Sequence, residues 1–239
     1  MRIVTWNCNM AFRKKLPLII GLKPDIVIVP ECEKPDRFQF NLYSKQPSDI
    51  LWHGNNPNKG LGVFSFNEYK FKLLDNHNIS FKTILPIVVS KKDFDFVLLA
   101  IWANNPAEKG SQYIEQVWKA IHYYDEQLNG RTLLAGDFNS NTIWDKQHKE
   151  GSHSSVVQKL AEKGIQSVYH LFYKQQQGRE MHPTFFTYRH KDKPYHLDYC
   201  FASDYFIKRL ESVEVGSYEE WTAYSDHKPL VVTFNTVAD

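Results

Sequence analysis

Short runs of Val, Ile, Leu and aromatic residues recur along the chain, and such runs predict β-strands. An earlier group of predicted strands spans 2–8, 25–30, 62–66, 85–90, 94–103 and 131–135. A later group spans 184–188, 196–202, 212–215 and 229–234. Polar segments separate the runs, so the pattern indicates a protein rich in β-structure.

Helical spacing of apolar residues predicts two helices between these groups. In the first, one face carries Ile114, Val117, Trp118, Ile121, Tyr124 and Leu128. The second spans about 154–163 and ends at Gly164, a residue type that commonly terminates helices. A shorter helix is predicted at 12–21, although Pro17 is unfavourable inside a helix.

Many strands and few helices predict an α/β protein in which two sheets pack face to face with helices outside. The sequence has no low-complexity tract, long linker or short repeat. We therefore expect residues 1–239 to form a single domain.

Charge limits the kinds of partner that the chain can bind. It has 239 residues, of which 29 are basic and 27 acidic, so the net charge is +2. This balance argues against a protein that coats nucleic acid or anionic membrane through bulk electrostatics, and any polyanion must be bound locally. The longest apolar runs, such as 84–89, are far shorter than the roughly 20 residues that cross a bilayer.

The cysteines indicate a reducing compartment. Cys8, Cys32 and Cys200 are odd in number, widely spaced and set among apolar residues, which predicts buried thiols. The first residues enter a strand pattern directly, without a signal-peptide core. We therefore expect a cytoplasmic protein without membrane insertion or an obligate protein partner.

The most informative residues are polar groups placed just after apolar strands, where a rigid backbone presents them to a substrate. Six such places carry Asn7 with Asn9, Glu31, Trp102 with Asn105, Asp137 with Asn139, Asp198, and Asp226 with His227. Each has an ordinary structural explanation when taken alone. Asp and Asn after strands form turns, Glu31 can cap a helix, and Asp198 can pair with an inward cation.

Together, four carboxylates, a histidine and several asparagines would form an oxygen-rich site beside an imidazole. Oxygen ligands without Cys or paired His spacing favour Mg²⁺ or Mn²⁺ over zinc. Such an ion stabilises charge on a phosphoryl group, a second carboxylate can activate water, and an imidazolium can bind phosphate oxygens. Phosphate ester hydrolysis is the reaction that this set of residues favours.

Several of these segments resemble the endonuclease/exonuclease/phosphatase superfamily, which includes pancreatic-deoxyribonuclease-like and exonuclease-III-like enzymes. The matching segments are 5–7, 24–27 leading to Glu31, 136–139, 196–199 and 225–227. The resemblance spans nearly the whole chain, and the order and separation of the segments make coincidence an inadequate explanation. It implies a four-layer α/β sandwich with the site at one edge.

The resemblance also implies roles for individual residues. Glu31 would be the main metal ligand, and Asp226 would help to bind the metal. Asn7 would lie near the metal and phosphate, and Asn139 would hold Asp137 and the phosphate.

The resemblance implies two further roles, and at two positions the sequence differs from that of relatives. Asp137 would position or deprotonate water, while Asp198 would orient His227 toward the phosphate. Asn9 stands where several related nucleases have an acidic residue, which should weaken a second cation. Trp102 stands where relatives have His or Tyr; it would stack on a substrate group or, equally, belong to the core, and Asn105 could replace a phosphate contact.

The substrate class stays open between two phosphate esters. The segment 184–189 is similar to the DNA-processing branch, in which aromatic residues line a nucleotide pocket, although alternating aromatics are more often core. We therefore expect a Mg²⁺-dependent phosphodiesterase, most simply a nuclease acting on DNA or another nucleic acid. The alternative is a small phosphate ester such as a nucleotide, phospholipid head group or inositol phosphate. A non-catalytic binding module is less favoured because the motif residues are all present.

Overall fold

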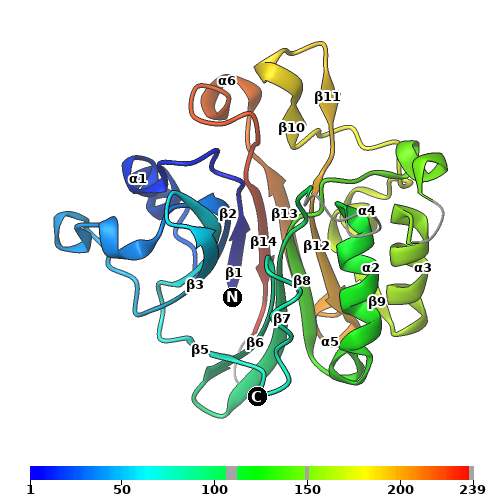
Figure 1. The fold of residues 1–239 in the computed structure, drawn as a ribbon, viewed down its shortest axis with the longest axis horizontal. Helices are drawn as coiled ribbons and strands as arrows, with labels where there is room; N and C mark the ends of the chain where they lie inside the picture. The colour runs from blue at the N-terminus through cyan, green and yellow to red at the C-terminus, as the bar shows by residue number, and fades with distance from the viewer. Residues whose placement is uncertain (106–111, 149–150, 237–239) are drawn as a thin grey trace.

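Two β-sheets face each other in the computed structural model, which describes residues 1–105, 112–148 and 151–236 (Figure 1). In these described ranges the first sheet has six strands in the order β13-β14-β1-β2-β4-β3. Its strands are β1 (Arg2–Thr5), β2 (Ile26–Cys32), β3 (Asp49–Asn56), β4 (Lys59–Ser65), β13 (Leu210–Val215) and β14 (Leu230–Phe234). Segments from both ends of the chain therefore build the first sheet.

The second sheet is built from the middle of the chain. Across the described ranges it also has six strands, in the order β5-β6-β7-β8-β12-β9. Its strands are β5 (Lys70–Leu73), β6 (Ile84–Lys91), β7 (Phe94–Trp102), β8 (Thr132–Asp137), β9 (Ile165–Ser167) and β12 (Asp198–Ser203). A separate two-stranded ribbon pairs β10 (Phe185–Phe186) with β11 (Pro194–Tyr195).

Helix α1 (Leu16–Gly21) covers the outer face of the first sheet, and α2 (Ile114–Tyr123) and α3 (His153–Glu162) cover that of the second (Figure 1). The other α-helices of the described ranges are α4 (Val168–Tyr173), α5 (Asp204–Ile207) and α6 (Tyr218–Trp221), of which α4 and α5 contribute residues to the cluster between the sheets. Short 3₁₀ helices lie at Phe12–Lys14, Pro35–Arg37, Phe40–Leu42, Asp125–Asn129, Thr142–Gln147 and Thr187–Arg189. None of the described helices is both long and apolar enough to span a bilayer.

Three apolar clusters separate the layers, because strands of both sheets are buried on both faces. Between the sheets, Ile28 of β2 belongs to the same cluster as Leu98 of β7. Outside the second sheet, Val117 of α2 packs with Leu134 of β8. Outside the first sheet, Ile19 of α1 belongs to the cluster that contains strand β2. The predicted α/β sandwich of two facing sheets flanked by helices is confirmed.

Several element predictions need correction. The segment 184–188 was expected to be one strand, but only Phe185–Phe186 pairs, because the backbone turns at Tyr188 with φ 55°. The segment 12–21 divides into a 3₁₀ turn and α1, and Pro17 lies in the first turn of α1, where its missing N–H costs little. The prediction of buried thiols is confirmed, since Cys8, Cys32 and Cys200 are buried and free.

Strand register brings distant polar residues to one edge of the sandwich. Strands β7 and β8 are parallel, and their pairing ends with Trp102 opposite Asp137. Strand β12 runs antiparallel to β8, so its first residue, Asp198, also lies opposite Asp137. In the first sheet β1 and β2 are parallel, so the segments that follow them leave the sheet at the same edge.

Candidate active site

Asp137 lies at the centre of the candidate site, and its carboxylate is fully buried. The amide Nδ2 atoms of Asn7 and Asn139 donate to Asp137 Oδ2 at 2.9 and 3.0 Å. The backbone N–H of Asn139 donates to the other oxygen, Oδ1, at 2.9 Å. Because Asn7 follows β1 of the first sheet, this carboxylate joins the two sheets at the site.

Gly136 permits the close approach of β7 and β8 just before Asp137. Its φ is +148°, and a Cβ atom placed there would lie 1.8 Å from the Ile101 carbonyl oxygen. Any larger residue would therefore push β8 away from β7 and move Asp137. The glycine in the segment 136–139 thus has a positional role in the site.

His227 and Asp198 form a buried pair beside Asp137. His227 Nδ1 lies 2.8 Å from Asp198 Oδ2, and because a carboxylate accepts, Nδ1 donates. The other ring nitrogen, Nε2, therefore points toward Asp137 Oδ2, at 3.9 Å. Asp198 is held in turn by its backbone N–H, which donates to Thr184 Oγ1 at 3.0 Å.

Burial and neighbouring charges shift the pKa values of this cluster. Burial raises the pKa of Asp137, and the nearby His227 charge opposes that shift. Burial alone would lower the pKa of His227, but the carboxylates of Asp198 and Asp137 outweigh it and raise the pKa above its ordinary value. The arrangement therefore favours a protonated imidazolium next to a carboxylate that can accept a proton.

Backbone and hydroxyl contacts fix the loop that carries His227. Ser225 Oγ donates to the carbonyl of Asn7 at 2.8 Å and accepts from the His227 N–H at 3.1 Å. Trp6 Nε1 donates to the His227 carbonyl at 2.9 Å. These contacts tie the end of β1 to the segment before β14. The sequence analysis did not predict the hydrogen bond of Trp6 to this loop, nor that of Thr184 to Asp198.

Glu31 lies across from Asp137 on an irregular part of β2. The pairing of β2 with β4 shifts register between Pro30 and Cys32, and Glu31 has a positive φ of 61°. Its side chain remains 18% exposed, and Asn7 Nδ2 lies 3.5 Å from its Oε1. Asn7 therefore contacts both Glu31 and Asp137.

Lys59 pairs with Glu31, a contact that sequence reasoning missed. Lys59 Nζ lies 3.1 Å from Glu31 Oε1 and 5.4 Å from the centre of the Trp102 ring. Trp102 is only 8% exposed and belongs to the cluster between the sheets. A cation thus covers a face of the indole that the sequence had offered as a stacking surface. Nothing in the sequence around Lys59 indicates that this side chain reaches Glu31.

Asn9 and Asp226 complete the rim near Glu31. Asn9 Nδ2 donates to Asp226 Oδ1 at 3.1 Å, and the Asn9 N–H donates to Asn7 Oδ1 at 3.0 Å. Lys15 Nζ donates to the carbonyls of Cys8 and Asn9, which holds this loop in place. Asn105 is exposed, and it makes no hydrogen bond with other residues in the described ranges.

The donor atoms fit a hard divalent cation. Glu31 and Asp226 offer carboxylate oxygens, and the ammonium of Lys59 on Glu31 shows that this carboxylate attracts a positive charge. Ligand atoms of Asp137, Asp198 and His227 also lie within 4.8 Å of one another. In that group, however, Asp198 already engages His227 Nδ1, whereas Glu31 is more accessible. Oxygen donors of this kind suit Mg²⁺ or Mn²⁺.

An aromatic pocket of about 500 Å³ opens beside Asn139. Its lining includes Trp144, Phe185 and Tyr195. The Phe185 ring packs on the His227 ring at 4.7 Å, and the Trp144 and Tyr195 rings are 4.9 Å apart. The pocket therefore continues directly from His227 and Asn139.

Solved structures share this architecture. An AP endonuclease from Archaeoglobus fulgidus superposes with a TM-score of 0.72 at 19% identity, covering 98% of this chain and 99% of that one. A 3′–5′ exonuclease from Neisseria meningitidis gives a TM-score of 0.70 at 20% identity, with coverages of 98% and 99%. At such identities the likeness shows the fold alone. A search of curated proteins found no match.

The two facing sheets, with a carboxylate–histidine–asparagine cluster at their shared edge, define a phosphoesterase-type α/β sandwich. The family model for the Endonuclease/Exonuclease/phosphatase family matches residues 4–227. The chain belongs to this family, whose members hydrolyse phosphate esters, and the predicted resemblance is confirmed. The matched range includes each residue that the sequence placed in the site.

Proposed function

We propose that the chain is a Mg²⁺-dependent phosphodiesterase that hydrolyses nucleic acid. The observation that carries the proposal is the buried carboxylate of Asp137, held by two amides next to the Asp198–His227 pair and opposite Glu31. A carboxylate that accepts a proton and an imidazolium that binds phosphate oxygens are the groups that phosphate ester hydrolysis needs.

Each group has a distinct task in the proposed mechanism. Asp137 orients the attacking water and accepts its proton, while Asn139 and Asn7 hold that carboxylate. His227 donates Nε2–H to a non-bridging phosphate oxygen, and Asp198 keeps its tautomer fixed. Glu31 and Asp226 would hold the divalent ion, which stabilises charge on the phosphoryl group and the leaving oxygen.

The aromatic pocket supports a nucleotide substrate. Phe185, Trp144 and Tyr195 offer ring faces next to His227 and Asn139. Base stacking on such rings contributes about 1–3 kcal/mol per base and tolerates different sequences. One solved structure similar to this chain is a 3′ phosphatase from Neisseria bound to a product DNA hairpin, at 19% identity and a TM-score of 0.69.

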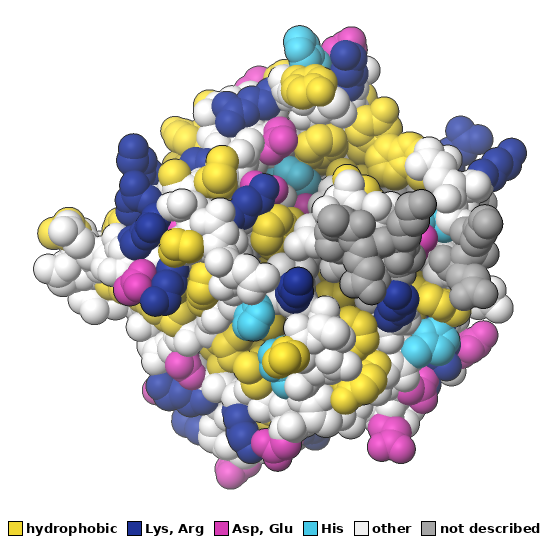
Figure 2. Space-filling model, viewed as in Figure 1, with side chains coloured by type: hydrophobic (Ala, Val, Ile, Leu, Met, Phe, Trp, Pro, Cys, Tyr) yellow, Lys and Arg dark blue, Asp and Glu magenta, His cyan; other side chains and the backbone are white. Residues whose placement is uncertain are grey.

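The surface charge supports local rather than extended binding of a polyanion. Figure 2 shows Lys and Arg side chains interspersed among apolar and neutral ones on the face viewed there. Tyr188, beyond the pocket, is 82% exposed and is followed by Arg189. Thr187, the residue before Tyr188, lines the pocket, so a strand that leaves the pocket would pass close to this exposed ring.

A small phosphate ester is the second candidate, and the size of the pocket favours it. A volume of about 500 Å³ accommodates a single nucleotide or a molecule of similar size. The chemistry at Asp137 and His227 would be unchanged. For either substrate, buried free thiols suit a reducing compartment, and we propose the cytoplasm as the place of action.

Cleavage of a labelled panel tests the proposal. Single-stranded, duplex and abasic-site DNA would be incubated with the protein and Mg²⁺, and the same panel would be run with Asp137→Asn. We expect cleavage by the wild type that EDTA abolishes and that the variant loses by at least about 10²-fold. The control, Asp204→Asn, changes a surface carboxylate and should retain full activity.

Two outcomes would overturn parts of the proposal. Hydrolysis of bis(p-nitrophenyl) phosphate or a mononucleotide without DNA cleavage would replace nucleic acid by a small ester. Equal DNA cleavage by the wild type and Asp137→Asn would remove Asp137 from the chemistry.

A further inference from the structure

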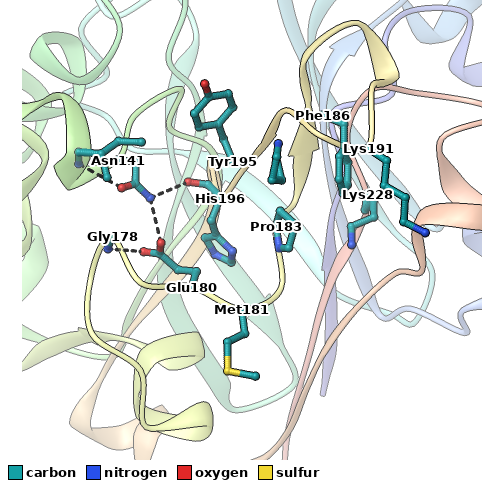
Figure 3. Close-up of a pocket in the computed structure, with 12 residues that line it drawn as sticks. Asn141, Gly178, Glu180, Met181, Pro183, Phe186, Lys191, Tyr195, His196 and Lys228 are labelled. Atoms are coloured by element: carbon teal, nitrogen blue, oxygen red, sulfur yellow. Dashed lines mark hydrogen bonds between the residues drawn. The ribbon is translucent and has the colours of Figure 1, made fainter.

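A second pocket lies on the other side of the segment that contains Phe185 and Phe186. Its volume is about 480 Å³, and its lining includes Phe186, Lys228 and His196 (Figure 3). Successive residues of an extended chain point to opposite faces. Phe185 bridges to His227 and packs on its ring, whereas Phe186 and Lys228 contact each other and line the second pocket. The two pockets are thus separated by one extended segment.

Lys228 places a buried positive charge in this second pocket. The residue is only 6% exposed, and its Nζ lies 5.3 Å from the centre of the Phe186 ring. Among the described residues, no carboxylate forms an ion pair with this Nζ, although the charge of Glu219, which pairs with Lys191, also acts on it. Burial lowers the pKa of Lys228 to about 8, and an anion bound in the pocket would favour the charged form of this lysine.

The opposite end of the pocket presents hydrogen-bond acceptors. His196 is 2% exposed, and its Nδ1 lies 2.8 Å from the carbonyl oxygen of His182, so Nδ1 carries the proton. Its Nε2 therefore has a free lone pair, and no described residue donates to it. Glu180 lines the same end, where its carboxylate already accepts from the Gly178 N–H at 2.8 Å and from Asn141 Nδ2 at 3.2 Å and lies 3.0 Å from His170 Nε2, so His196 Nε2 is the acceptor without a partner there.

The two ends of the pocket therefore differ in chemistry, with a cation at one end and hydrogen-bond acceptors at the other. Figure 3 shows Lys228 and Phe186 on one side and Glu180 and Asn141 on the other. Between these ends, the wall includes Tyr195 and Pro183. An anion suits the lysine end, a flat ring suits the middle, and a hydrogen-bond donor suits the end near His196.

We propose that this pocket binds a phosphate monoester of nucleotide size, with its phosphate on Lys228 and its ring against Tyr195. An amino group on the ring would face the acceptors at the end formed by His196 and Glu180. The ligand is a free mononucleotide or the terminal nucleotide of a strand, since both present the same groups. The site is separate from the catalytic pocket, and its occupancy does not depend on the proposed hydrolysis.

Calorimetric titration of the metal-free protein in EDTA tests the proposal without any turnover. The probes are AMP, ribose 5-phosphate and inorganic phosphate. We expect AMP to bind more tightly than the other two, because only AMP has the ring and its amino group. Lys228→Met should weaken the binding of AMP and phosphate by about tenfold or more, whereas Lys228→Arg should retain part of it.

Matched controls separate this pocket from the catalytic one. Lys72→Met removes an exposed charge on β5 and should leave AMP binding unchanged, and Asp137→Asn should do the same. Far-UV circular dichroism and thermal unfolding would verify that Lys228→Met is folded. A 5′-phosphorylated trinucleotide that competes with AMP would identify the strand terminus as a ligand, and failure to compete would leave the free nucleotide.

Three results would overturn the proposal. They are no binding of AMP at millimolar concentration, equal binding by the wild type and Lys228→Met, and loss of AMP binding in Asp137→Asn. The third result would assign the ligand to the catalytic pocket. None of these three results depends on whether the protein cleaves DNA, so the proposed function is tested separately.

Discussion

Asp137 and Asp198 lie opposite each other on paired strands, yet their carboxylates have different partners. Asp137 accepts two side-chain amides and a backbone N–H, whereas Asp198 accepts the ring N–H of His227. In the proposed mechanism, therefore, Asp137 acts on water and Asp198 acts only through the imidazole. The environment of each carboxylate, rather than its residue type, assigns its role.

Asp198→Asn tests the proposed role of Asp198, because it replaces one carboxylate oxygen by an amide NH₂ group. An amide oxygen can still accept from His227 Nδ1, but it no longer supplies the negative charge that favours the imidazolium. We expect turnover to fall roughly 10²–10⁴-fold with little change in substrate KM. Steady-state kinetics on the preferred substrate would measure it, with Asp204→Asn as control. Turnover within twofold of the wild type would contradict the role of Asp198.

Lys59→Met tests the competition between a side chain and a metal ion for Glu31. Removing an ammonium that lies 3.1 Å from the carboxylate removes a like charge that opposes an incoming cation. We expect the Kd for Mn²⁺ to fall by roughly tenfold. Titration of free Mn²⁺ by electron paramagnetic resonance measures this without substrate. Unchanged or weaker Mn²⁺ binding would contradict the competition, and Lys72→Met is the matched control.

The structure brings together five of the residues that the sequence placed in one candidate site, but the sequence did not predict every contact around them. Asn7, Asp137, Asn139, Asp198 and His227 are brought together, because each follows or begins a strand whose apolar pattern is clear. The pairing of Lys59 with Glu31 could not be predicted, because it depends on the register of β2 with β4. Long-range register leaves no local signal in the sequence.

At the scale of elements, the pairing of β7 with β8 positions the site. Both strands are parallel neighbours in the buried middle of the second sheet, and their apolar runs were predicted from the sequence. Strands β3 and β5 were missed, because their residues are partly exposed and carry no continuous apolar run. Strand β9 has only 3 residues, too few for a pattern to emerge.

Gly136→Ala tests how strongly this pairing depends on one missing side chain. The new Cβ would meet the Ile101 carbonyl oxygen at 1.8 Å, in a backbone conformation that L residues rarely adopt. We expect the free energy of unfolding to fall by at least about 3 kcal/mol, measured by urea denaturation. Gly21→Ala is the control, because nothing lies within 4 Å of its added Cβ. If the free energy of unfolding of Gly136→Ala fell by less than about 1 kcal/mol, β8 would be able to shift away from β7 at little energetic cost.

At the scale of the whole molecule, the candidate active site joins the two sheets at one edge. Asn7, Glu31 and His227 belong to segments of the first sheet, whereas Asp137 and Asp198 belong to the second. The facing-sheet architecture was predicted from the abundance of strands. Which strands form each sheet was not, because the assignment depends on side-chain packing between segments far apart in the chain.

Buried histidines connect the stability of the whole molecule to pH. Burial lowers the pKa of His153 and of His196 to about 4, compared with 6.5 for an unburied histidine. The unfolded chain therefore binds protons at a higher pH than the folded chain. Each histidine favours folding above pH 6.5, and this contribution is lost as the pH falls toward 4.

His153→Gln isolates one of these contributions. We expect the variant to be less stable than the wild type at pH 7, and the difference to shrink by roughly 2–3 kcal/mol at pH 4.5. Urea denaturation at both pH values measures the change. His122→Gln, at an exposed position, is the control for the loss of a histidine that is not buried. A constant difference for His153→Gln would mean that His153 titrates in the folded protein as it does in the unfolded chain.

The division of the first sheet between the two ends of the chain also has a consequence during protein synthesis. Strands β1 to β4 emerge early from the ribosome, but β13 and β14 join the same sheet only after the middle of the chain has been translated. A nascent chain that ends before residue 225 lacks both Asp226 and His227. The proposed phosphodiesterase activity would therefore begin only once that late segment has been translated and has docked, so the unfinished chain would be inactive.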